Sequence, residues 1–163
     1  MARCLIIGCG CRGLELAREL IARGHTVRAT TRDPARTSEI EATDAEAVVA
    51  DPDRIATLIP ALEHAAVACI LLGSATGTAE SVAALHSSRL EMLLLRLLDT
   101  TVRGVVYEAA GTVDASVLAG ASELVRRLCD DSRIPYALLS DVAPGAWPGQ
   151  AADAVDRVLW RGR

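Results

Sequence analysis

A glycine-rich hexapeptide, GCGCRG at residues 8–13, is the stretch of this sequence best suited to chemistry. It follows the apolar run ARCLII and precedes LELARELIARG, whose apolar residues recur at helical spacing. Gly8 permits a tight turn, Gly10 lets a phosphate approach the backbone, and Gly13 allows the helix to pack closely on the strand. Free N–H groups and the positive end of the helix dipole would then face the phosphates. The spacing predicts a loop that holds a dinucleotide pyrophosphate, with an unoccupied turn of the same shape as the simpler alternative.

Basic side chains near this loop bear on which dinucleotide it would hold. Arg32 follows Thr31 at the end of the second predicted strand, where a guanidinium would pair with a 2′-phosphate on the adenosine ribose. Arg12 in the glycine loop, next to Cys11, and Arg28 on the strand would assist, unless they are solvated surface residues. This arrangement favours NADP over NAD.

Strand-like and helix-like segments alternate along the chain and must position these residues. Strands are predicted at 2–8, 25–33, 46–51, 67–73, 102–109 and 134–140, and helices at 14–24, 54–62, 80–98, 116–129 and 151–160. The alternation predicts one α/β domain over residues 1–163, a doubly wound parallel sheet of about six strands with helices on both faces. A ligand binds such a sheet beyond the carboxyl ends of its strands, where the glycine loop lies.

With these features, the sequence resembles the atypical and extended short-chain dehydrogenase/reductases, including NmrA-like and epimerase-like members. The resemblance rests on LIIGCGCRG, on ATTRDP at the second strand, on VVADPDR at the third, and on the spacing of the later strands. It implies a Rossmann sheet of strand order 321456 and a site for NAD(P). It also implies that Asp51 lies near the adenine, and that Gly73, Ser74 and Ala75 line the ribose and nicotinamide side. Asp51 is equally suited to be the N-cap of the helix that follows.

The motif GCG also opens the cofactor loop of many S-adenosylmethionine-dependent methyltransferases, which is the alternative function. Sequences of that family resemble D-x-G-C-G-x-G and end their second strand in an acid that holds the ribose hydroxyls. Ile6 and Thr31 occupy the matching positions here, and neither side chain has the carboxylate that this pattern requires.

Departures from the dehydrogenase pattern concern catalysis. That family uses a Ser or Thr after the fifth strand and a Tyr-x-x-x-Lys in which Lys lowers the Tyr pKa, but this chain contains no Lys. Ala109 and Ala110 stand where related sequences have a Ser pair, and Asp114 stands near the place of the Tyr. Tyr107 and Tyr136 are expected to be buried or edge residues. We therefore expect a cofactor-binding or sensing module, similar to NmrA-like regulators, or a minimal reductase, and assign no catalytic residue.

Trp147 is the notable side chain of the Pro/Gly-rich loop at residues 140–150. It would cover a nicotinamide or a small substrate, or it would only anchor the loop through its apolar area.

Composition excludes several kinds of partner. The 21 acidic and 17 basic residues give a net charge of -4 and are interspersed, so no basic stripe is available for nucleic acid. No apolar run approaches the roughly 20 residues of a membrane span, and no signal-peptide core is recognisable. The five cysteines are expected to be reduced thiols, and neither they nor the three histidines show metal-ligand spacing. We expect a cytoplasmic protein without a metal site.

The stretch LEMLLLRLLDT at residues 90–100 is apolar on more than one helical face. One face must cover the sheet, and the remainder needs another cover. Because short-chain dehydrogenases often dimerise through the helices beside the fourth and fifth strands, the resemblance predicts a symmetric homodimer through residues 82–98. Tighter burial of these residues within one monomer is the alternative.

Overall fold

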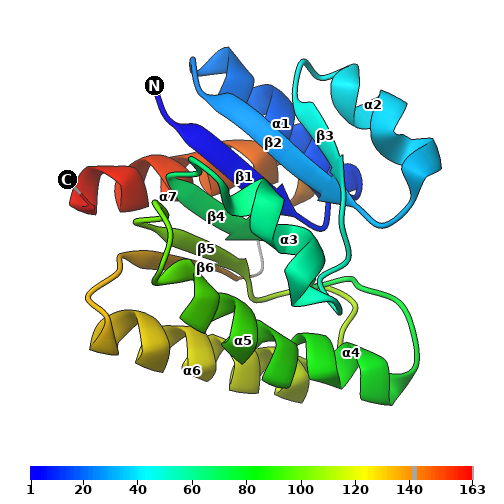
Figure 1. Cartoon of the computed structure of the whole chain (residues 1–163), viewed down its shortest axis with the longest axis vertical. Helices are drawn as coiled ribbons and strands as arrows, with labels where there is room; N and C mark the ends of the chain where they lie inside the picture. The colour runs from blue at the N-terminus through cyan, green and yellow to red at the C-terminus, as the bar shows by residue number, and fades with distance from the viewer. Residues whose placement is uncertain (141–142, 163) are drawn as a thin grey trace.

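A six-stranded sheet forms the centre of the computed structural model, which describes residues 1–140 and 143–162. Its strands are β1 (Arg3–Ile7), β2 (Thr26–Thr31), β3 (Glu46–Val49), β4 (Val67–Ile70), β5 (Val105–Glu108) and β6 (Tyr136–Leu139). Their spatial order is β3-β2-β1-β4-β5-β6, and every neighbouring pair is parallel (Figure 1). The predicted α/β class, a doubly wound sheet of order 321456, is confirmed.

Helices cover both faces of this sheet and make three layers. They are α1 (Cys11–Ala22), α2 (Thr37–Glu41), α3 (Ile55–Leu62), α4 (Ala79–Leu85), α5 (Ser88–Leu97), α6 (Ala115–Asp131) and α7 (Trp147–Arg161), with short 3-10 turns η1 (Pro34–Arg36) and η2 (Pro144–Ala146). The helices α1, α2 and α7 pack on one face, and α3, α5 and α6 pack on the other. None of the helices within the described ranges combines the length and the apolar character needed to cross a bilayer.

The alternation of side chains along β1 explains the two cores. Cys4 and Ile6 point into the core with α1 and α7, whereas Leu5 and Ile7 point into the core with α3, α5 and α6. All four side chains are fully buried. A strand with both faces covered reads as a continuous apolar run, which is the pattern that identified β1 in the sequence.

Two helical segments differ from the prediction. The single helix expected at 80–98 is two helices, because the chain leaves helical geometry at Ser87 (φ -132°, ψ -95°) after the buried His86. The segment from Pro34 to Glu41 is helical although no helix was predicted there. Its one buried residue is Ile40, and one apolar position creates no periodicity.

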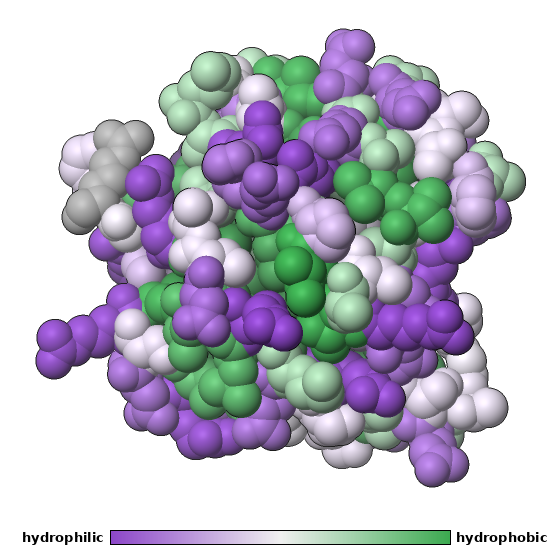
Figure 2. Space-filling view, viewed as in Figure 1, coloured by the Kyte–Doolittle hydropathy of each residue, from purple (hydrophilic) through white to green (hydrophobic). Residues whose placement is uncertain are grey.

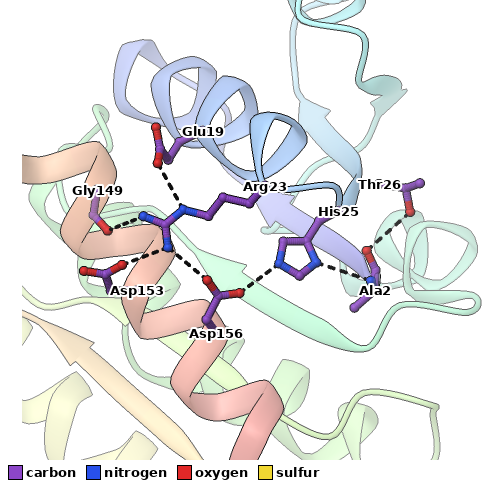
Figure 3. A network of polar contacts seen from close by, with 8 residues as sticks. All are labelled: Ala2, Glu19, Arg23, His25, Thr26, Gly149, Asp153 and Asp156. Atoms are coloured by element: carbon purple, nitrogen blue, oxygen red, sulfur yellow. Dashed lines mark hydrogen bonds and ion pairs between the residues drawn. The ribbon is translucent and has the colours of Figure 1, made fainter.

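A polar network ties the end of α1 to α7 on the side of the sheet where the strands begin (Figure 3). Arg23 Nη1 lies 2.8 Å from Asp153 Oδ1 and 2.9 Å from Asp156 Oδ2. His25 Nδ1 accepts the N–H of Ala2 at 3.3 Å, so Nε2 carries the proton donated to Asp156 at 2.8 Å. Partial burial opposes ionisation of Asp156, but the hydrogen bonds from His25 and Arg23 lower its pKa overall. The network thus holds the last helix against the first.

Candidate functional site

A cleft of about 680 Å³ opens at the carboxyl ends of the central strands. It lies where the strand order reverses between β1 and β4, the position at which doubly wound sheets bind ligands. Its walls come from the glycine loop, the end of β2, the segment after β3, the loop after β4 and the last residue of β5. The lining residues are Gly8, Cys9, Gly10, Cys11, Arg12, Gly13, Thr30, Thr31, Arg32, Asp33, Arg36, Ala50, Pro52, Leu71, Leu72, Ser74, Ala75, Thr76, Leu85 and Glu108.

The three glycines of the loop meet different constraints. Gly8 has φ +85°, and a Cβ added there would lie 2.6 Å from Leu72 Cδ2. A Cβ at Gly13 would lie 3.0 Å from Cys9 Sγ. A Cβ at Gly10 would meet no atom within 4 Å, so the described protein itself does not require glycine there. Gly10 is therefore the position where an open backbone serves the cleft rather than the fold.

Unused hydrogen-bond donors mark the start of α1. Gly10 is the N-cap and supplies no side chain, and the first turn of the helix holds no acidic residue. Among the described residues, the N–H groups of Cys11, Arg12 and Gly13 find no acceptor. With the positive end of the dipole of a 12-residue helix, these donors form a site suited to phosphate oxygens.

Two arginines line the wall that follows β2. Arg32 is exposed and makes no hydrogen bond or ion pair with the part of the chain that the structure describes. Arg36 in η1 pairs with Glu39, with Nη2 3.1 Å from Oε2. Arg36 was not predicted as a site residue, although its position four residues after Arg32 in RDPAR was a usable signal.

Arg28 is engaged elsewhere. It is 9% exposed, its Nε lies 2.9 Å from Glu46 Oε2, and Nη1 donates to the carbonyl oxygens of Ala61 and Glu63 at 2.9 Å each. These are carbonyls at the end of α3, which the guanidinium caps. The assistance to a 2′-phosphate that was expected of Arg28 is therefore corrected to a structural role.

Arg12 crosses the cleft toward β5. Its Nη1 lies 3.2 Å from Oε2 of Glu108, and its guanidinium carbon lies 5.3 Å from the centroid of the Trp147 ring. Trp147 is 2% exposed in the core at the start of α7, so it anchors this segment instead of covering a ligand. Residues 141–142 of the predicted loop lie outside the described residues.

The remaining predicted residues lie at or behind the cleft walls. Ser74 lines the cleft and Thr31 does so beside Arg32, whereas Asp51 and Gly73 are not among the described residues that line it. Asp51 Oδ1 accepts the N–H of Asp53 at 2.9 Å, while the N-cap of α3 is Arg54, so the N-cap alternative for Asp51 is wrong. Gly73 donates its N–H to Glu108 Oε1 at 2.7 Å. Asp51 and Gly73 thus shape turns behind lining residues.

Neither tyrosine is among the described residues that line the cleft. Tyr107 is fully buried, burial raises its pKa, and its hydroxyl lies 2.6 Å from Nδ1 of His86 on the face covered by α5. Tyr136 is half-buried on the edge strand β6. The expectation that both are buried or edge residues is confirmed.

All five cysteines are free thiols, and only Cys11 is exposed. Burial raises the pKa of Cys9, which belongs to the glycine loop, to about 11. Within residues 1–140 and 143–162, no three His, Cys, Asp or Glu side chains cluster as metal ligands would.

Comparison with solved structures places this fold among reductases and epimerases. A provisionally assigned betaketoacyl-ACP reductase is 17% identical with a TM-score of 0.71, and the match covers 97% of this chain and 90% of that one. UDP-glucuronic acid 4-epimerase from Bacillus cereus, solved with NAD, is 13% identical with a TM-score of 0.68, covering 83% of this chain and 54% of that one. An NADPH-dependent quinone oxidoreductase from Escherichia coli is 18% identical with a TM-score of 0.62, and the match covers 88% of this chain and 48% of that one. This chain thus spans about half the length of the last two proteins.

Comparison with curated proteins gave no match. The model of a family described as NAD(P)H-binding matches residues 8–128, from the first glycine of the loop to the end region of α6. The matched part includes the glycine loop, the arginines after β2 and Glu108. The chain therefore belongs to the NAD(P)H-binding family.

Proposed function

We propose that the cleft binds NADP(H) in preference to NAD(H). The observation that carries this proposal is Arg32, which is exposed, lines the cleft and makes no hydrogen bond or ion pair with the described residues. Arg36 lines the same cleft. A pyrophosphate on the free N–H groups of α1 directs the adenosine half toward β2 and the nicotinamide half toward β4. Arg32 then meets the 2′-phosphate that distinguishes NADP from NAD, and a guanidinium fork suits that dianion.

The proposed adenosine side ends at the segment after β3. Ala50 and Pro52 line the cleft there, and the turn made by Asp51 holds them. Apolar contacts of this kind suit the faces of an adenine ring. Asp51 would act near the adenine through the shape of this turn, because its carboxylate accepts the N–H of Asp53.

The proposed nicotinamide side is mostly apolar. Leu71, Leu72, Ala75 and Leu85 line it, and Ser74 supplies a hydroxyl. A reduced nicotinamide bound there would supply a hydride to a carbonyl or quinone acceptor and leave as the oxidised cofactor. The residues present would bind and orient the ring and exclude water from one of its faces.

We propose a sensing module or a minimal reductase in place of a dehydrogenase of the usual mechanism. The chain has no Lys, and two alanines, Ala109 and Ala110, follow β5. The Tyr107 hydroxyl is bonded to His86 in the core that α3, α5 and α6 cover. Glu108 lines the cleft, but its oxygens are already bonded, Oε1 to the N–H of Gly73 and Oε2 to Nη1 of Arg12, so we assign it no catalytic role. Supply of a proton to a substrate would then fall to water.

Calorimetric titration with NADPH, NADH and S-adenosylmethionine tests the cofactor. Binding of NADPH at least about tenfold tighter than NADH supports the proposal. Binding of S-adenosylmethionine alone would establish the methyltransferase alternative, and equal affinities for NADPH and NADH would refute the role of Arg32. A turnover screen with quinones and aldehydes then separates a reductase from a sensing module.

We also propose that two copies associate through residues 82–98 and that the protein works in the cytoplasm. Met92, Leu95 and Leu98 are 48%, 49% and 45% exposed, and Figure 2 shows apolar surface at the lower left, over α5. A shallow groove between α5 and the end of α6 continues this surface. An apolar face of this kind favours association with another apolar surface. Five free thiols suit a reducing compartment.

A further inference from the structure

Glu108 is a buried carboxylate that joins two walls of the cleft. Its side chain is 4% exposed, Oε1 accepts the N–H of Gly73 at 2.7 Å, and Oε2 lies 3.2 Å from Nη1 of Arg12. Arg12 belongs to the glycine loop and Gly73 to the loop after β4. A buried carboxylate is tolerated only where such partners compensate its lost hydration, so the three groups hold one another.

The loop after β4 is itself packed tightly against the loop after β5. A Cβ at Gly73 would lie 2.4 Å from the carbonyl oxygen of Ala110, so the two backbones are in contact. Val113 donates its N–H to Gly73 O at 3.0 Å, and Thr112 donates its N–H to Ser74 Oγ at 3.2 Å. A displacement of Glu108 would therefore carry Ser74 with it.

Arg12 is held at the opposite end of the cleft from Arg32. Three strand intervals separate β2 from β5, a distance of roughly 14 Å at the usual strand spacing. The guanidinium of Arg12 reaches Glu108 at the end of β5 and stacks on Trp147, while its side chain remains 39% exposed. Arg12 thus stands beside the half of the cleft proposed for the nicotinamide, away from the proposed 2′-phosphate position.

We propose that Glu108 is a positioning residue for the nicotinamide half of a bound dinucleotide, an inference that rests on the proposed function. Its bonds to Arg12 and Gly73 hold the glycine loop and the loop after β4 at the separation that one dinucleotide must span. Rigid placement of two contact segments reduces the ordering cost of binding. Arg12 then supports binding of NADPH and NADH alike, and selectivity for the 2′-phosphate rests with Arg32.

The test compares whole dinucleotides with an adenosine-side fragment. Glu108→Gln keeps an oxygen for the N–H of Gly73 but removes the charge that holds Arg12. This substitution should lower the affinities for NADPH and NADH by about tenfold each and leave their ratio unchanged. The affinity for 2′,5′-ADP should change by less than about twofold. Glu123→Gln, an exposed isosteric change on α6, is the control and should alter none of the three affinities.

A double-mutant cycle keeps the proposal testable if Glu108→Gln impairs folding. Arg12→Gln breaks the same pair at a half-exposed position, and the double variant should bind NADPH no more weakly than the weaker single variant. Equal losses for NADPH and 2′,5′-ADP, no loss for either, or additive losses in the cycle would each overturn the role of Glu108. Failure of the unmodified chain to bind NADPH would instead overturn the proposed function.

Discussion

The hydroxyl of Tyr107 lies 2.6 Å from Nδ1 of His86, and Nε2 of the same ring lies 2.9 Å from the carbonyl oxygen of Leu72. A carbonyl oxygen only accepts, so Nε2 carries the proton and Tyr107 donates to Nδ1. Both side chains are buried, at 0% and 2% exposure. The tyrosine of β5 therefore fastens the junction of α4 and α5 to the sheet.

Tyr107→Phe should destabilise the fold without touching the cofactor. It leaves Nδ1 of His86 buried and unpaired, which costs about 1–3 kcal/mol of unfolding free energy. Urea unfolding measures that loss, and Tyr136→Phe at the half-buried edge position should cost less. A variant of native stability that had lost NADPH affinity would show instead that the Tyr107 hydroxyl reaches the cofactor.

Acidification should weaken the fold through His86. Burial lowers the pKa of His86, with the hydrogen bond to Leu72 O opposing this effect. The unfolded chain then binds the proton more readily, so stability is complete above the ordinary His value of about 6.5 and falls as the pH drops below it. Unfolding free energies at pH 7.5 and 5.5 measure the difference, and His86→Gln should reduce it. An unchanged pH dependence in His86→Gln would assign the effect to other groups.

Substitutions in the glycine loop should separate folding from binding. Gly10→Asp places a favoured N-cap residue in open space, so thermal stability should hold or rise. The new carboxylate would face the pyrophosphate and lower the affinity for NADPH by more than about a hundredfold. Gly8→Ala should instead lower stability by about 1–3 kcal/mol, because φ there is +85° and the new Cβ meets Leu72. NADPH affinity retained in Gly10→Asp would place the dinucleotide elsewhere.

Arg32→Ala should lower the affinity for NADPH by about 10- to 100-fold, the usual contribution of a charge-assisted hydrogen bond. The affinity for NADH should stay unchanged. Arg36→Ala should show a smaller effect of the same kind, since Glu39 already neutralises part of its charge. Arg127→Ala, an exposed change on α6, is the matched control. Calorimetry with both cofactors measures the ratio, and equal losses for the two would contradict a role in selectivity.

Leu95→Glu should convert a dimer into a monomer. Leu95 is 49% exposed at the centre of the α5 surface, and a charge there would have to be buried between two copies. Sedimentation velocity over a concentration series measures the association. The control is Ile59→Glu, at a 41% exposed position on α3, which should leave the dimer intact. A monomeric unmodified chain would refute the interface.

Local patterns made the first half of the site predictable. The run into β1, the three glycines and the start of α1 are consecutive in sequence, so their spacing alone placed the loop and the cleft. The partners of Arg12 and Arg28 were not predictable, because Glu108 is 96 residues from Arg12 and the α3 carbonyls are more than 30 residues from Arg28. The break between α4 and α5 was hidden for the same reason, since the groups that bond His86 lie on β5 and in the loop after β4.

The packing of α7 on α1 has a consequence for synthesis of the chain. Leu16, Ala17 and Leu20 of α1 share a core with Ala151, Val155 and other residues of α7. During translation, the first 50 residues emerge long before α7, so this apolar surface stays open to water or to chaperones. The edge of β1 that pairs with β4 likewise stays unpaired until β4 has been synthesised. Closure of the α1 face then has to await the synthesis of α7. Removal of α7 would leave the glycine loop in place and expose the part of the α1-side core that α7 covers.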